Sequence, residues 1–281
     1  MPLTLVPTPV GNLEDITLRA LRVLREADLI ACEDTRTSGA LFRRYGIARP
    51  LLSLHLHNER ERTERLLTAL AEGKHVAVVS DAGTPGISDP GWLLLRDALT
   101  AGYKADVLPG PSALIPAVLL SGLPPHPFLF YGFPPEKLGQ RKKLFASLEA
   151  QPYTMVFYVS PHKARRQIAE TREAWGDRRA ALVREISKIY QEALRGTLSE
   201  ISERLAQSVK GEMTLVVEGR EGAGPRHKDW KEVAEELLTG GFSARDAARE
   251  AAERCGVSKN IVKEFLLRRH AENSLGETLG K

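Results

Sequence analysis

Short apolar runs and longer helical patterns alternate along the first 120 residues. Val76–Val79 is a short apolar run rich in β-branched residues, which predicts a buried strand. Similar runs predict strands at 3–6, 29–32, 51–54 and 105–108. Helical spacing predicts a helix that starts at Asn12 or Asp15 as N-cap and runs to Glu26, and further helices at 37–45, 59–72, 91–101 and 112–121. This alternation favours a mostly parallel sheet with helices on both faces.

A second alternation begins after Gly122–Pro127, a segment of glycine and proline that predicts a domain boundary. Strands are expected at 128–132, 154–159, 179–184 and 213–218, with helices at 137–149, 162–175 and 198–209. Residues 219–225 suit a linker, and 230–270 have helical spacing broken at Cys255–Ser258, which suits a helix-turn-helix unit. We therefore predict an α/β chain with domains at 1–121 and 122–220 and a helical unit at 226–281.

The ends of the predicted strands carry the most distinctive sequence. Ser80–Gly91 follows the apolar run and contains three glycines, which allow sharp turns and close approach to a ligand. Asp89 and Pro90 at its end suit an N-cap and a first helical turn. Polar or glycine-containing turns also follow three other strands, at 7–12, 33–36 and 109–113, the last with Ser112 as N-cap. In a parallel sheet the four turns share the carboxyl edge, which predicts one crevice for an elongated ligand. A tight βα connection without a ligand is the alternative.

Charge is distributed unevenly along the 281 residues. The formal net charge is +4, and residues 137–210 hold 15 Lys and Arg against 8 Asp and Glu, whereas residues 1–136 hold 13 against 15. The basic middle suits a polyanion, although solvated basic surfaces are common. The two cysteines favour a reducing cytosol without a disulfide framework, and no signal-peptide or membrane-spanning pattern is apparent.

Several familiar site motifs are missing from the sequence. It has no Walker A loop, no GxGxxG after a strand, no zinc-type Cys/His spacing and no GxSxG elbow. His55 and His57 lack an evident third ligand, so we interpret them as strand-end polar residues or residues that face a substrate. A dense polar segment at 183–197 is either a solvated loop or a functional one. Its charged and aromatic residues include Arg184, Glu185, Lys188, Tyr190, Glu192 and Arg195.

Motifs along nearly the whole chain resemble those of the ribosomal RNA small subunit methyltransferase I family, within the tetrapyrrole-methylase fold group. They are, in order, LVPTPVGNLEDITLRA, ACEDTRTSGALFRRYGI, VVSDAGTPGISDPG, LPGPSALIPAVLLSGL, GFPP, YVSPHKA, VREISKIYQEALRGTL and KGEMTLVVEG. The resemblance implies a cytoplasmic homodimer that binds S-adenosylmethionine between two α/β domains. It implies methylation of the ribose 2′-hydroxyl of a cytidine in the decoding region of 16S rRNA, in the 30S subunit or its free rRNA. Pro7–Gly11 departs from the glycine-rich first loop of tetrapyrrole-methylating members, which favours the RNA-modifying branch.

The resemblance implies the cofactor contacts, and the chemistry of the residues suggests those that face the substrate. Cofactor contacts are expected from Val10, Val79, Ser80, Asp81, Thr84, Ile87, Ser112, Ala113, Tyr158, Val159, Glu185, Glu212 and Met213. Candidates for handling the substrate proton are Lys188 and Glu185, with Glu33 and Asp34 as rivals. RNA phosphates are expected at Arg36, Arg184 and Arg195, and in the tail at Lys259, Lys263, Arg268 and Arg269. No metal is expected.

Other functions stay open on the sequence alone. A tetrapyrrole C-methyltransferase would share the fold and the cofactor. A non-catalytic RNA-binding or assembly factor would use the basic middle and the tail without binding the cofactor. A DNA-binding regulator is disfavoured because the tail has balanced charge. The tail itself is either an RNA contact or a packing or dimer element.

Overall fold

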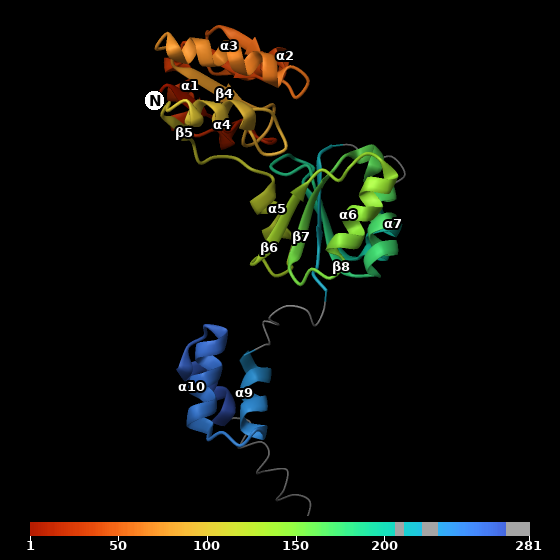
Figure 1. The fold of residues 1–281 in the computed structure, drawn as a ribbon. Coiled ribbons are helices and arrows are strands. Elements are labelled where there is room, and N and C mark those ends of the chain that lie inside the picture. The colour runs from red at the N-terminus through yellow and green to blue at the C-terminus, as the bar shows by residue number, and fades with distance from the viewer. Residues whose placement is uncertain (206–210, 221–229, 268–281) are drawn as a thin grey trace, which may run out of the picture. The chain divides into compact units, whose positions relative to one another are not determined.

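The computed structural model describes residues 1–205, 211–220 and 230–267 and divides into two compact units, Met1–Glu221 and Gly222–Lys281. The first unit contains two five-stranded sheets, and the described part of the second is helical (Figure 1). No helix among these residues combines the length and apolar character needed to cross a membrane.

The first sheet is entirely parallel, as predicted. Its order is β3-β2-β4-β1-β5, and β4 lies at the centre with every residue at most 1% exposed. The strands are β1 (Leu3–Leu5), β2 (Leu29–Cys32), β3 (Leu51–Ser53), β4 (Val76–Val79) and β5 (Ala105–Val107). Because all five run the same way, their carboxyl ends meet at one edge.

Helices cover both faces of this sheet. One face packs against α1 (Leu18–Glu26) and α2 (Thr35–Arg44), and the other packs against α3 (Glu59–Ala71) and α4 (Trp92–Thr100). A short 3₁₀ helix, η1 (Leu13–Asp15), precedes α1. The predicted helices of this part are thus confirmed, with ends that differ by one or two residues for α2, α3 and α4.

The predicted N-caps are wrong. The cap position of the helix at Leu114–Ser121 is Ala113, although the neighbouring Ser112 Oγ accepts a hydrogen bond from Leu114 N–H at 3.2 Å. Asn12 caps only η1, and the hydroxyl of Thr17 accepts the hydrogen bond from Ala20 N–H that starts α1, at 3.0 Å. Asp89 does not cap α4, which begins after Gly91. Instead Glu59 Oε1 accepts hydrogen bonds from the N–H groups of Gly91 at 2.7 Å and Leu93 at 3.2 Å. A side chain 32 residues before Gly91 thus replaces the local cap.

The second sheet has the order β6-β7-β10-β8-β9, and only β6 and β7 are parallel. The strands are β6 (Phe128–Gly132), β7 (Thr154–Val159), β8 (Arg179–Arg184), β9 (Glu192–Thr197) and β10 (Met213–Val217). β9 was not predicted, because it lies within the polar segment 183–197 and no residue of it is fully buried. β9 is an edge strand. Its hydrogen bonds to β8 hold it in the sheet, although its polar sequence does not predict a strand.

Helices also cover both faces of the second sheet (Figure 1). One face packs against α6 (Leu138–Leu148), α7 (Ala164–Trp175), which follows the 3₁₀ turn η2 (Pro161–Lys163), and α8 (Leu198–Arg204). The other face packs against α5 (Leu114–Ser121). We assigned α5 to the first domain by sequence, but its buried residues Ala117 and Val118 belong to the core of the second sheet.

The second unit has its own small core. α9 (Trp230–Thr239) packs against α10 (Ala244–Cys255), and residues 259–267 are again helical after a left-handed Gly256. The predicted order of helix, glycine turn and helix is confirmed. Lys259 and Lys263 are exposed on the last helical segment, and the predicted Arg268 and Arg269 lie outside the described residues.

Candidate functional site

A cavity of about 400 Å³ opens at the carboxyl edge of the first sheet, where loops of that sheet face the second one. Its size suits a small-molecule ligand. Residues of the 80–91 loop and the 109–113 turn form one side, and residues at the ends of β6, β7 and β10 form the other. The two sheets therefore build this site jointly.

Hydrogen bonds tie the strand-end turns together. The backbones of Thr8 and Gly83 exchange two hydrogen bonds of 2.9 Å, and the Thr8 hydroxyl donates to the carbonyl of Ser80. The Thr84 hydroxyl donates to the carbonyl of Pro111 at 3.3 Å. These bonds connect three of the four predicted turns, at 7–12, 80–91 and 109–113. The fourth turn, at 33–36, joins them through the hydrogen bond from Asp34 N–H to Asp81 Oδ1 at 3.1 Å.

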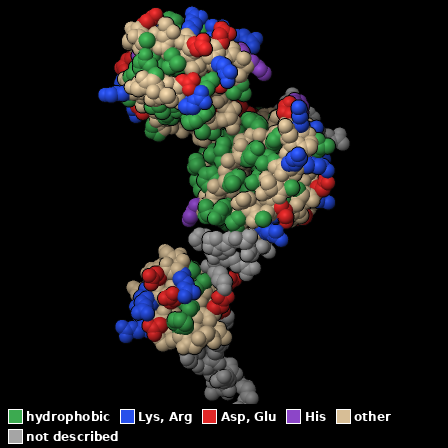
Figure 2. All heavy atoms as spheres, in the orientation of Figure 1, with side chains coloured by type: hydrophobic (Ala, Val, Ile, Leu, Met, Phe, Trp, Pro, Cys, Tyr) green, Lys and Arg blue, Asp and Glu red, His purple; other side chains and the backbone are tan. Residues whose placement is uncertain are grey.

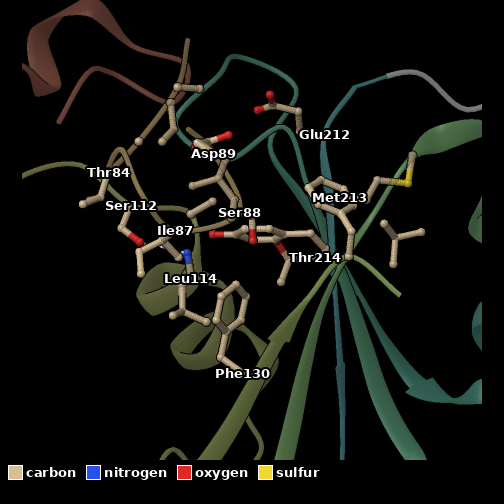
Figure 3. Close-up of a pocket in the computed structure, with 18 of the residues that line it drawn as sticks. Thr84, Ile87, Ser88, Asp89, Ser112, Leu114, Phe130, Glu212, Met213 and Thr214 are labelled. Atoms are coloured by element: carbon tan, nitrogen blue, oxygen red, sulfur yellow. Dashed lines mark hydrogen bonds between the residues drawn. The ribbon is translucent and has the colours of Figure 1, made fainter. Parts of the chain in front are cut away.

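The cavity has an apolar end and an acidic end (Figure 3). Leu114 and Phe130 lie near one end, and the ring of Phe130 packs edge-on against Tyr158 with centroids 5.0 Å apart. The carboxylates of Asp89 and Glu212 lie near the other end. Such a site accepts a flat apolar group together with a cation.

Burial and neighbouring carboxylates perturb the acidic end. Burial is the main cause that raises the pKa of Asp89 to about 7, and the charges of Glu33, Asp81 and Glu212 add to it. Burial, with smaller effects of Asp89 and Glu212, raises the pKa of Tyr158 to about 12. A ligand cation placed here would favour the ionised form of Asp89.

Most residues that the resemblance assigned to the cofactor line this cavity. They are Val10, Thr84, Ile87, Ser112, Ala113, Tyr158, Val159, Glu212 and Met213. Ser80 and Asp81 line a smaller cavity instead, and Val79 is buried in the core of the first sheet. Glu185 lines neither cavity.

Sequence reasoning missed several lining residues. Asp89 was interpreted only as an N-cap, although a carboxyl group at the end of a glycine-rich strand-end loop is itself a signal for a ligand site. Phe133 belongs to the motif GFPP, which contributes to the family resemblance, but the sequence assigns this residue no role in a site. The other missed lining residues are Ala82, Gly83, Ser88, Leu114, Phe130, Ser160, Pro161, Ile186 and Thr214.

The segment after β8 is docked against the first sheet's loops. Ser187 Oγ donates to the carboxylate of Asp15, and a Cβ on Gly11 would lie 2.5 Å from both the carbonyl oxygen of Ile186 and Cγ of Lys188. Lys188 Nζ pairs with Glu185 Oε1 at 2.9 Å. Neither residue of this pair lines the cavity, but Ile186, which lies between them in the sequence, does.

The two rival carboxylates after β2 differ in environment. Hydrogen bonds from Arg36, first from its side chain and then from its N–H, hold the pKa of Asp34 at about 2. Burial, and then the charge of Asp81, raises the pKa of Glu33. Because a general base works best near the operating pH, Glu33 is the better suited of the two.

The predicted RNA-binding arginines are engaged to different extents. The Arg36 side chain is 90% exposed although it pairs with Asp34. Arg184 pairs with Glu192 at 2.5 Å, and Arg195 Nε donates to the carbonyl of Leu120 at 2.7 Å. Arg36 and Arg195 are thus exposed, whereas the Arg184 side chain is only 29% exposed.

One family of methylases matches most of the chain that forms the two sheets and the cavity. Residues 2–202 match the family described as Tetrapyrrole (Corrin/Porphyrin) Methylases. Among solved structures, a diphthine synthase aligns with a TM-score of 0.60 at 16% identity, over 77% of this chain and 89% of that one. The methyltransferase CobJ aligns with a TM-score of 0.59 at 22% identity, over 79% and 97%. At these identities the two structures support the fold alone.

Curated relatives are much closer in sequence. A "Ribosomal RNA small subunit methyltransferase I" of Pseudomonas aeruginosa is 40% identical over 277 residues, which cover 96% of this chain and 98% of the relative. A protein of the same name from Bacillus subtilis is 39% identical over 269 residues, covering 93% and 91%. The chain belongs to the tetrapyrrole methylase family and, within it, to the ribosomal RNA small subunit methyltransferase I group.

The methyl donor of this family is S-adenosylmethionine. The cavity suits this donor, because the apolar end accepts an adenine ring and the carboxylates of Asp89 and Glu212 complement its sulfonium and ammonium cations. No group of three or more His, Cys, Asp or Glu residues in the described part of the chain is arranged to hold a metal ion.

Proposed function

We propose that the protein transfers a methyl group from S-adenosylmethionine to the ribose 2′-hydroxyl of a cytidine in the decoding region of 16S rRNA, as a cytoplasmic enzyme acting on the 30S subunit or its free rRNA. The supporting observation is a largely apolar cavity with the carboxylates of Asp89 and Glu212 near one end, at the strand ends of a chain that matches small-subunit rRNA methyltransferases over nearly its full length. We assign to the surrounding residues the positioning of donor and substrate and the charges that bind them.

The cofactor supplies an electrophilic methyl group. Asp89 and Glu212 would hold the cationic part of the donor, and Phe130 and Leu114 would hold its flat ring. The docked 185–188 segment fixes the approach of the substrate by its contact with the first turn. Aligning a hydroxyl with a reactive methyl group accounts for much of the rate in reactions of this kind.

The substrate hydroxyl must lose its proton. We assign acceptance of this proton to Glu33. It directly precedes Asp34, whose N–H donates to Asp81 in the lining of the smaller cavity, and its pKa is raised whereas that of Asp34 is lowered. Lys188, paired with Glu185, orients the ribose or an adjacent phosphate as a cation. Arg36, Arg184 and Arg195 contact RNA phosphates.

The test is methyl transfer to 30S subunits purified from cells that lack the protein, followed by nucleoside mass analysis of 16S rRNA. We expect 2′-O-methylcytidine at one position. Glu33→Gln should lower kcat by about 10²- to 10⁴-fold, the usual contribution of a general base, with unchanged donor affinity. Lys188→Ala should lower kcat/KM for RNA, whereas Lys74→Ala, just before β4 at the opposite edge of the first sheet, should change nothing. Full activity of both site variants would remove these assignments.

A tetrapyrrole substrate is the second candidate, because the fold is shared with the methyltransferase CobJ. Incubation with labelled donor and a porphyrinoid separates the two, since we expect label only in rRNA. A non-catalytic RNA-binding role predicts no heat on titration with S-adenosylmethionine, whereas the cavity predicts binding.

We also propose that the chain forms a homodimer. Apolar side chains gather on the surface over α5 and β6 (Figure 2), and the exposed ones include Ile115, Leu119 and Tyr131. Contiguous exposed apolar surface of this kind marks protein contacts. Light scattering should give twice the chain mass, and Leu119→Lys should reduce it to one chain.

A further inference from the structure

We propose that the smaller cavity beside the main one binds the base of the nucleotide being methylated, and that Asp81 recognises the amino group of cytosine there. This inference rests on the proposed function, because it names the part of the RNA that this second cavity receives. The cavity has a volume of about 240 Å³, below the size typical of a whole drug-like ligand and ample for a single ring.

The two cavities are neighbours on the same edge of the first sheet. The hydrogen-bonded Thr8–Gly83 pair stands at their border. Val10, Ala82 and Gly83 line the main cavity, whereas residues one to three positions earlier on the same two turns line the smaller one: Thr8, Pro9, Ser80 and Asp81. A ligand in either cavity therefore lies next to a ligand in the other, as methyl donor and methyl acceptor must.

The lining of the smaller cavity suits a pyrimidine. Apolar side chains that can contact the faces of a ring come from the first turn, from η1 and from α2: Pro9, Leu13, Ala40 and Leu41. The hydroxyls of Thr37 and Ser38 stand among them and can each donate or accept a hydrogen bond at the ring edge. This combination of apolar faces and a polar edge matches a base removed from its stack.

Asp81 makes the cavity selective. Its Oδ1 accepts the hydrogen bond from Asp34 N–H, and within the described part of the chain no donor is bonded to Oδ2. A carboxylate oxygen accepts a hydrogen bond from the N4 amino group of cytosine but repels O4 of uracil. At the rim, Arg36 precedes the lining residue Thr37 and extends its 90% exposed side chain toward solvent, where it can meet an adjacent phosphate.

The test compares substrates that carry C or U at the target position, at about pH 8, well above the ordinary pKa of an aspartate. The enzyme should methylate the C substrate and discriminate against U. Asp81→Asn presents an amide that can donate to O4, so the C-over-U ratio of kcat/KM should fall at least tenfold, in line with the usual discrimination of one base contact. Asp97→Asn, a carboxylate variant on α4 outside both cavities, should keep the ratio.

A second variant tests the cavity without touching Asp81. Ala40→Trp fills the cavity from the exposed side of α2, so KM for RNA should rise at least tenfold while calorimetry shows unchanged affinity for S-adenosylmethionine. If the natural enzyme methylates neither RNA, the proposed function fails. If the natural enzyme methylates the C substrate, the proposed function stands. The base cavity is then refuted if Asp81→Asn leaves the C-over-U ratio of kcat/KM unchanged, or if Ala40→Trp leaves KM for RNA unchanged.

Discussion

At the scale of single residues, the acidic end of the cleft carries a group whose charge depends on pH near neutrality. The pKa of Asp89 is about 7 in the folded protein against an ordinary value of 3.8. Between these values the folded protein holds a proton that the unfolded chain has released. Above pH 7, where Asp89 is ionised in the folded protein, its burial therefore lowers the free energy of unfolding. This loss becomes smaller as the pH falls from 7 toward 3.8, the pKa of the unfolded chain.

Asp89→Asn removes this charge. We expect the variant to melt at a higher temperature than the natural protein at about pH 8, with a smaller difference at about pH 5. It should bind S-adenosylmethionine about 10- to 100-fold more weakly at the higher pH, because a hydrogen bond to a charged group is lost. Scanning calorimetry and titration calorimetry at both pH values measure these effects. A melting difference that is the same at both would contradict the assigned pKa.

Gly11 is the residue on which the contact between the first turn and the 186–188 segment depends. Its missing side chain leaves room for the Ile186 carbonyl, a backbone atom that cannot move cheaply. Gly11→Ala should destabilise the protein by about 1–3 kcal/mol, the usual cost of overpacking, and should lower kcat. Gly39→Ala is the control, because its nearest neighbour is Arg43 at 3.6 Å and alanine favours a helix. Denaturant unfolding of both variants measures the difference, and equal stability would refute the clash.

At the scale of elements, the start of α4 fixes the end of the 80–91 loop. Glu59, at the start of α3, supplies the hydrogen bonds that a local cap would otherwise make. The loop that forms one side of the cavity is thereby fastened to a neighbouring helix. In the second sheet, the pairing of the edge strand β9 with β8 likewise fixes a side chain: it places Glu192 in an ion pair with Arg184.

Glu59→Ala should destabilise the protein by about 1 kcal/mol, the usual cost of a lost cap, and weaken donor binding through the loosened loop. Glu61→Ala is the matched control, because it removes a carboxylate from the same first turn of α3 but leaves the α4 cap intact. Thermal melts and donor titrations compare the two. If Glu61→Ala costs as much, the helix dipole of α3 rather than the cap of α4 explains the loss.

At the scale of the whole molecule, the chain divides into two compact units, Met1–Glu221 with the two sheets and Gly222–Lys281 with a small helical core of its own. Both sheets and both cavities lie within Met1–Glu221. The exposed Lys259 and Lys263 belong to the second unit. Donor binding and RNA affinity are therefore expected to be separable.

Deletion of residues 226–281 should leave the affinity for S-adenosylmethionine unchanged. RNA should bind more weakly, and the slope of log affinity against log salt should become shallower, because fewer phosphate contacts release counterions. Filter binding over a range of salt concentrations measures both quantities. The double variant Lys259→Ala and Lys263→Ala should reproduce part of the change in slope, while unchanged RNA affinity after the deletion would make the helical unit a packing or dimer element.

The sequence by itself determined the parallel first sheet, its helices, the shared edge of turns and the helical tail. Each of these follows from local periodicity and turn chemistry, as in Val76–Val79 and the glycines after it. Only the tertiary structure decided the antiparallel pairing of β9, the cap from Glu59 and the burial of Asp89 in the lining of the cavity. These depend on contacts between residues far apart in the chain, and no local pattern encodes which distant group will supply a hydrogen bond or remove a side chain from water.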